Sequence, residues 1–167
     1  MALRTIVLKN DPILRKKSRA VVDFDARLHV LLDDMWETLR KANGLGLAAP
    51  QVGTLRRVVI IDVGPEPAEA KTRPMHADHE KACYEIINPE ILETRGEIES
   101  QEGCLSIPGY SGMVKRPAWV KISAQDRNGT PFLLEGEGML AKAIFHETDH
   151  LDGILYTDLA TDLEKVE

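Results

Sequence analysis

The pentapeptide His146-Glu147-Thr148-Asp149-His150 constrains this chain more than any other segment, because its two histidines lie four residues apart. The turns before it are apolar and Gly153 follows as a stop, so the sequence predicts a helix from about Gly138 to Leu151. On a helix both imidazoles project from one face and can share a metal ion, with Glu147 beside them. Two solvated histidines on a charged helix are the simpler alternative, but the apolar turns predict a buried helix.

A third ligand is needed, since a catalytic site of this kind has three protein ligands and one open position. After His150 the sequence contains no further histidine, and Glu164 is expected in a C-terminal tail. Upstream, Cys104 lies between Gly103 and a turn-like Ser-Ile-Pro-Gly, where its thiolate could approach a metal. The alternative is that Cys104 is a small buried apolar side chain. The residues by themselves leave both interpretations open.

The glycine-rich segment 44–51, Gly-Leu-Gly-Leu-Ala-Ala-Pro-Gln, matches the G-x-G-x-x-A pattern of dinucleotide-binding folds. That pattern follows a strand and opens a helix, whereas this segment follows a predicted helix and contains Pro50. A nucleotide site is therefore not expected. A shaped loop that brings backbone groups and the amide of Gln51 against a substrate fits the sequence better.

The rest of the chain predicts one α+β domain over residues 1–167, with antiparallel strands around the C-terminal helix and a second helix near the N-terminus. That second helix spans Ala26–Ala42, where apolar residues recur at helical spacing between Asp25 and Asn43-Gly44. Pro89 is expected only at an edge or a bulge. Further predicted segments are an N-terminal arm (1–24), strands at 57–63, 86–94 and 97–101, a hairpin of 119–125 with 131–135 turning at Asn128-Gly129, and an exposed insertion (64–83).

Composition excludes several classes of function. Among 167 residues, 21 are Lys or Arg and 27 are Asp or Glu, so the net charge of −6 comes without the basic stripe that a nucleic-acid site requires. No apolar run is long enough to span a membrane, and the start of the chain does not have the pattern of a signal peptide. Two cysteines do not form a disulfide framework. A cytoplasmic protein is expected.

Three separated motifs resemble, in order and spacing, those of the peptide deformylase family. They are the segment 44–51, Glu-Gly-Cys-Leu-Ser at 102–106, and His-Glu-Thr-Asp-His-Leu-Asp-Gly at 146–153; Asp-Pro-Ile-Leu-Arg at 11–15 fits as well. The resemblance covers essentially the whole chain. It implies an amidohydrolase that removes the formyl group from the N-terminal methionine of new polypeptides, so that its partners are N-formyl-methionyl nascent chains, with transient ribosome association.

The resemblance also implies a role for each motif residue. Cys104, His146 and His150 would hold one metal ion, and Glu147 would act as general base and then general acid. Gln51 and the backbone N–H of Leu105 would stabilise the oxyanion, and Gly46 would hydrogen-bond the substrate backbone. An apolar pocket for the methionine side chain is expected at Leu45, Met139 and Ala143.

The metal is expected to be iron(II), which the resemblance implies as the physiological ion. A thiolate with two imidazoles also suits zinc, nickel or cobalt. Two departures from the family are visible: Phe145 takes a position that is often Gln, and the insertion carries His76, His79 and Cys83, a spacing that could bind a second metal. An exposed polar loop is the preferred interpretation of the insertion. An H-E-x-x-H metalloprotease and a non-catalytic structural metal module remain the alternatives.

Overall fold

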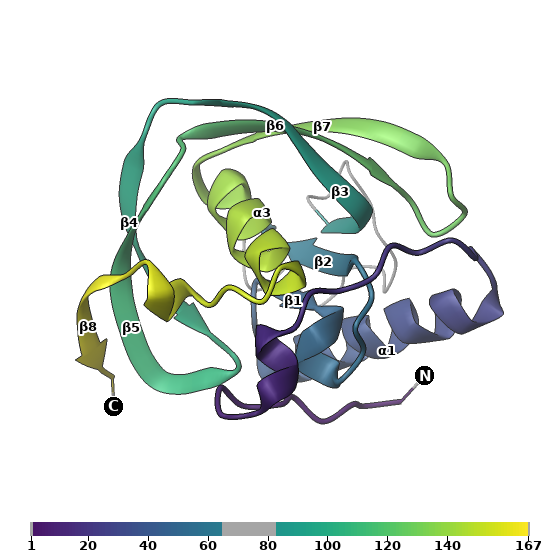
Figure 1. The fold of residues 1–167 in the computed structure, drawn as a ribbon, viewed down its shortest axis with the longest axis horizontal. Coiled ribbons are helices and arrows are strands. Elements are labelled where there is room, and N and C mark those ends of the chain that lie inside the picture. The colour runs from purple at the N-terminus through teal and green to yellow at the C-terminus, as the bar shows by residue number, and fades with distance from the viewer. Residues whose placement is uncertain (1, 65–82, 167) are drawn as a thin grey trace.

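The computed structural model describes residues 2–64 and 83–166, which form an α+β fold with a helix enclosed between two antiparallel sheets (Figure 1). The first sheet has five strands in the order β1-β2-β3-β6-β7, and the second has three in the order β4-β5-β8. The elements, in chain order, are η1 (Pro12–Arg15), α1 (Ala26–Ala42), β1 (Gly46–Ala48), η2 (Ala49–Val52), β2 (Val58–Asp62), β3 (Cys83–Arg95), β4 (Ile98–Cys104), β5 (Ile107–Arg116), β6 (Trp119–Gln125), β7 (Pro131–Glu137), α3 (Gly138–Leu151), η4 (Tyr156–Asp158) and β8 (Thr161–Lys165).

The predicted N-terminal helix is confirmed as α1, with the expected boundaries. The side chain of Asp25 accepts a hydrogen bond from Leu28 N, and Asn43 ends the helix in the left-handed conformation. Its apolar face packs on one side of β2, against Val58 and Ile60. None of the helices in the described parts of the chain is long and apolar enough to cross a membrane.

Helix α3 covers the other side of the same strand, where Val59 and Ile61 pack against it with Ile144. Because helices cover both faces of β2, its first four residues are fully buried. This explains why they read as one continuous apolar run rather than an alternating one. The α3 boundaries match the prediction, and α3 lies at the centre of Figure 1 between the two sheets.

The predicted hairpin is confirmed as β6 and β7, which pair from Trp119 with Glu137 to Gln125 with Pro131. Pro89 lies within β3 at an irregularity, because the register against β6 shifts between Ile87 and Glu90. Asn88 has a positive φ of 53° at this point. The expectation that Pro89 occurs only at an edge or a bulge is therefore also confirmed.

The structure corrects three sequence-based predictions. Residues 44–51 contain the short edge strand β1 before the 3-10 helix η2, rather than an irregular loop throughout. The segment after Cys104 turns only at Leu105 and Ser106, and Ile107 already begins the ten-residue strand β5. The expected tail forms β8, which pairs with β5 through Ser111 and Glu164.

The predicted insertion 64–83 falls mostly on residues 65–82, which lie outside the described residues together with His76 and His79. Cys83 does not belong to an exposed loop. It is the first residue of β3 and is fully buried in the core beside α1. The burial of Cys83 argues against its inclusion in a surface metal site.

Candidate metal centre and active site

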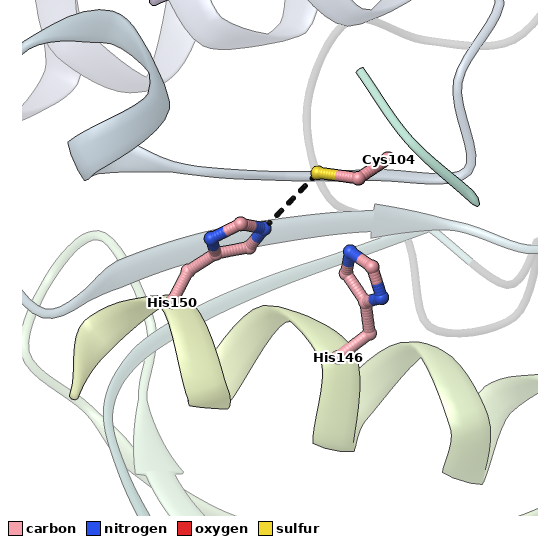
Figure 2. Close-up of side chains that lie close together, drawn as sticks. All are labelled: Cys104, His146 and His150. Carbon is pink, nitrogen blue, oxygen red and sulfur yellow. Dashed lines mark hydrogen bonds between the residues drawn. The ribbon is translucent and has the colours of Figure 1, made fainter. Parts of the chain in front are cut away.

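The three predicted metal ligands come together although they lie on different elements. Cys104 ends β4, while His146 and His150 lie one turn apart on α3. One ligand atom from each side chain lies within 4.8 Å of the other two. Figure 2 shows both imidazoles rising from α3 toward the sulfur, with Cys104 Sγ 3.4 Å from His150 Nε2.

A buried carboxylate orients His146. Glu102 Oε1 lies 2.9 Å from His146 Nδ1, so the hydrogen on Nδ1 is used there and Nε2 can act as a ligand atom. Arg116 donates two hydrogen bonds of 2.9 Å to Glu102, and a third of 2.7 Å to Asp149 on α3. Burial opposes ionisation of Glu102, but Arg116 and His146 prevail and lower its pKa to about 2.

The two histidines differ in pKa because their neighbours differ. Burial acts against the charged form of His146, yet the hydrogen bonds with Cys104 and Glu102 and the charge of Glu147 raise its pKa to about 10. Burial, with the nearby charges of His146 and Arg116, lowers the pKa of His150 to about 3. His150 is therefore the neutral imidazole of the pair. A cation would have to displace the proton of His146, because only deprotonated groups coordinate metals.

Glu147 lies beside the histidines without joining the group of ligand atoms. Its Oε1 is 3.9 Å from His146 Nε2, and its Oε2 is buried with no hydrogen-bond partner among the described residues. Burial raises the pKa of Glu147 to about 7, with the positive charge of His146 acting in the opposite direction. The carboxylate fits here because position 46 is glycine: a Cβ there would lie 2.9 Å from Glu147 Cγ.

The amide of Gln51 is fixed by its neighbours. Its Oε1 accepts from Ala48 N at 3.0 Å, so its Nε2 points away from η2, toward Ser106 Oγ at 3.1 Å and Cys104 Sγ at 3.5 Å. Gln51 is 1% exposed. Leu105, the residue that follows Cys104, lies in the turn after β4. Its side chain packs against the core cluster to which α1 contributes.

A pocket of about 260 Å³ opens at this cluster. It brings together all the residues that the sequence assigned to substrate binding and catalysis, together with two of the three predicted metal ligands, Cys104 and His146. Leu45 and Met139 are large apolar side chains that remain 45% and 53% exposed. Apolar surface of this kind beside polar groups is typical of a binding pocket. The lining residues are Gly44, Leu45, Gly46, Gln51, Glu102, Gly103, Cys104, Leu105, Met139, Lys142, Ala143, His146 and Glu147.

Sequence reasoning assigned no role to several residues at this site. Glu102 is part of the motif 102–106, so its position was visible, but its partner Arg116 lies on the next strand with no local pattern to indicate the contact. The ring of Tyr156 stacks on His146 at 5.9 Å between centroids. Lys142 lines the pocket and donates to Gln101 O.

Two residues singled out in the sequence do not line the pocket. Glu164, considered as a ligand, lies exposed on β8. Phe145, which takes a position that is often Gln in the family, is buried between α3 and the five-stranded sheet.

These features define a class of protein: a hydrolase built around a helix-borne H-E-x-x-H metal site, with a buried carboxylate and an apolar pocket beside it. Comparison with known proteins narrows the class. The polypeptide deformylase family model matches residues 3–166. Peptide deformylase from Caldicellulosiruptor bescii is 51% identical over 158 residues, 95% of this chain and 86% of its own length. Peptide deformylase 1 from Clostridium acetobutylicum is 48% identical over 164 residues, 98% of this chain and 99% of its own.

Solved structures agree with this result. A peptide deformylase from Legionella pneumophila superimposes with a TM-score of 0.85 at 40% identity, covering 96% of this chain and 88% of its own. The enzyme from Thermotoga maritima gives a TM-score of 0.85 at 34% identity, covering 96% and 99%. The chain belongs to the polypeptide deformylase family. It is a metal-dependent amidohydrolase that removes the formyl group from N-terminal methionine.

Proposed function

We propose that Cys104, His146 and His150 hold one divalent metal ion and that Glu147 performs the proton transfers of deformylation. The ligand set fits a metal because a thiol and two imidazoles converge in a buried site, and Glu102 leaves Nε2 of His146 available for coordination. When bound, the ion supplies a Lewis acid that polarises the formyl carbonyl and lowers the pKa of water.

Glu147 is the proton carrier in this proposal. Its carboxylate accepts a proton from the attacking water, whose oxygen bonds to the formyl carbon. The carbon–nitrogen bond then breaks as Glu147 returns the proton to nitrogen, so that a free amine and formate leave rather than an amide anion. Burial supports this role, because it keeps the pKa of the carboxyl near neutrality.

Gln51 and Leu105 stabilise the negative charge that develops on the formyl oxygen. The Gln51 amide is already oriented by Ala48 and Ser106, so one Nε2–H group has only to leave Cys104 Sγ, 3.5 Å away, to donate to the oxyanion. The backbone N–H of Leu105 follows the sulfur ligand directly and supplies the second donor. Both residues line the pocket at the cluster of ligand atoms.

The substrate lies between two sheet edges. Strand β1, with Gly46, is an edge of the five-stranded sheet, and β4, with Gly103, is an edge of the three-stranded sheet. Both glycines line the pocket, so an extended peptide can pair with either backbone, as in strand addition. Leu45, Met139 and Ala143 then receive the methionine side chain. A formyl carbon bears only hydrogen, so a tight site admits it and excludes larger acyl groups.

The observation that carries this proposal is the convergence of Cys104, His146 and His150 beside the unpartnered carboxylate oxygen of Glu147 at a pocket. A structural metal module is not favoured, since such sites are closed by four protein ligands. An internal metalloprotease is not favoured either, because the chain matches the deformylase family over residues 3–166.

The physiological ion in this proposal is iron(II), with zinc, nickel or cobalt as substitutes that the same donor set accepts. The enzyme works in the cytoplasm on nascent formyl-methionyl chains and associates transiently with ribosomes, where those chains emerge. Residues 1–167 act as one catalytic domain. Anaerobic purification with metal analysis tests the ion, and cosedimentation with ribosomes tests the association.

The decisive experiment compares three variants for metal stoichiometry and for single-turnover release of formate from a formyl-methionyl peptide. Glu147→Gln keeps the shape of the side chain but cannot act as base, so it should retain near-normal metal and lose about a hundredfold or more in rate. Cys104→Ser and His146→Ala should lose both metal and rate. An internally cleavable peptide is the control and should stay intact.

Two results would contradict the proposal. A Glu147→Gln variant that kept most of its rate would exclude Glu147 as the base, and a Cys104→Ser variant with full metal and full turnover would exclude the ligand set.

A further inference from the structure

Lys142 connects α3 to the edge strand β4 across one wall of the active-site pocket. Its side chain lines the pocket, and its Nζ donates a hydrogen bond of 2.7 Å to the carbonyl oxygen of Gln101. Gln101 is exposed on β4, three positions before Cys104. The ammonium group is therefore held at the rim of the pocket rather than extended freely into solvent.

Lys142 brings a positive charge to this rim, although the whole protein carries a net charge of −6. Among the described residues that line the pocket, Lys142 is the only Lys or Arg. The carboxylate of Glu102 is neutralised by two hydrogen bonds from Arg116. Within residues 2–64 and 83–166, no carboxylate forms an ion pair with Lys142, so two of its three N–H groups remain available to a ligand.

In a substrate bound in the proposed mode, the residues that follow the methionine would lie close to the ammonium group of Lys142. Met139 and Ala143, which receive the methionine side chain in the proposed mode, lie on either side of Lys142 on α3. Extended chains advance by about 3.3 Å per residue, so a peptide lying along β4 from Cys104 reaches the level of Gln101 within about three residues. The second and third residues of the substrate are therefore the ones that lie near the ammonium group of Lys142.

We propose that Lys142 is a specificity-determining residue, which favours formyl-methionyl chains carrying a carboxylate side chain at the second or third position. This inference rests on the proposed function of the pocket. The ammonium adds a charge-assisted contact to an acidic side chain and repels a basic one. Because the pair is partly exposed, the expected discrimination is modest, about two- to fivefold in kcat/KM for each change of charge.

The test measures kcat/KM on formyl-methionyl tripeptides that differ only in Glu, Gln or Lys at position two or three. The wild-type enzyme should prefer Glu over Gln and Gln over Lys at one of these positions, and salt at about 0.5 M should weaken the preference. Lys142→Met should abolish it, Lys142→Glu should reverse it, and Lys142→Arg should retain it. The ratio between peptides is the measurement, so any loss common to all substrates cancels.

Lys115→Met is the matched control. It removes the same charge from β5, where Lys115 is 67% exposed and lies 3.9 Å from Glu99, away from the pocket lining. This variant should keep the wild-type ratio. Equal rates on the Glu and Lys peptides at low salt, or a Lys115→Met variant that flattens the ratio as much as Lys142→Met, would overturn the inference. If every peptide is deformylated at the same rate, the inference about Lys142 fails but the proposed function stands. If no peptide is deformylated, the proposed function itself fails.

Discussion

Gly46 leaves room for the side chain of Glu147 because it has no Cβ. The carboxylate of Glu147 occupies the space that a side chain at position 46 would need, since a Cβ there would lie 3.0 Å from its Oε1. Such a contact forces either the strand or the carboxylate to move. Gly46, the first residue of the edge strand β1, thus sets the position of the proposed base.

Replacing Gly46 by Ala should therefore damage catalysis through Glu147. We expect stability to fall by about 1–3 kcal/mol, and kcat to fall while metal content is kept. Gly103→Ala is the control for stability, because its Cβ would meet Tyr110 O at an ordinary 3.5 Å. Thermal unfolding and formate release measure the two effects. An unchanged kcat in Gly46→Ala would show that Glu147 tolerates displacement.

Gln51 is a second residue with a proposed role in catalysis. Loss of one oxyanion donor costs on the order of 3 kcal/mol, or about a hundredfold in rate. Gln51→Ala should therefore lower kcat far more than it raises KM. Ser106→Ala, which removes only the acceptor at 3.1 Å from Gln51 Nε2, should have a much smaller effect on kcat. A change confined to KM in Gln51→Ala would indicate that the amide only holds substrate.

Among the elements, β4, β5 and α3 are joined by one buried guanidinium. Arg116 on β5 pairs with Glu102 on β4 and with Asp149 on α3, and its side chain is 5% exposed. Since Glu102 also contacts His146, the same network that holds the three elements together orients a proposed metal ligand. We therefore expect fold stability and metal affinity to be coupled at Arg116.

Arg116→Met should lower both quantities. Removing one partner of a buried ion pair leaves a buried charge unpaired, which costs about 3–5 kcal/mol. Metal affinity should fall by about 10–100-fold because Glu102, which orients His146, loses the two hydrogen bonds from Arg116 that hold it in place. Lys115→Met, next to it but exposed, should change stability by less than about 0.5 kcal/mol. Urea unfolding and metal titration provide the measurements, and normal metal affinity in Arg116→Met would rule out the coupling.

At the scale of the whole molecule, the N-terminal arm and the C-terminal region meet beside the C-terminal end of α3. Arg15 of η1 binds Asp158 of η4 through two nitrogens, one of them Nη2 at 3.0 Å from Oδ1, and Ser18 N donates to Leu151 O at the end of α3. A Cβ on Gly153 would lie only 2.5 Å from Arg15 O, so the two segments pack backbone to backbone.

The Arg15–Asp158 pair predicts a dependence of stability on pH. The hydrogen bond from Arg15 lowers the pKa of Asp158 below its usual 3.8, while partial burial opposes the shift. A lowered carboxyl pKa stabilises the fold above the unfolded value and loses this effect as pH falls through the folded value. Both side chains are more than a third exposed, so we expect Asp158→Asn to cost only about 0.5 kcal/mol at pH 7.

Urea unfolding of wild type and Asp158→Asn at pH 7, 5 and 3.5 tests this dependence. The difference between the two proteins should be constant from pH 7 to 5 and should shrink below about pH 4. A difference that grew toward acid pH would have the wrong sign for this pair.

The sequence alone determined α1, α3 and the β6–β7 hairpin, because each is specified by periodicity and turn residues within about twenty positions. It also determined the family and brought the candidate ligands to attention, since Cys104, His146 and His150 lie in motifs whose chemistry is visible in the residue types. The close approach of their ligand atoms agrees with the interpretation of Cys104 as a ligand rather than a buried apolar side chain.

Tertiary structure decided what connects these motifs. Strand β8 has five exposed residues and no alternating pattern, so only its pairing with β5 makes it a strand. Likewise, the contacts of Arg116 with Glu102 and Asp149, and of Lys142 with Gln101, join residues 14 to 41 positions apart. Contacts between such distant residues leave no local periodicity in the sequence. They depend on how the sheets close around α3, and that closure orients the site.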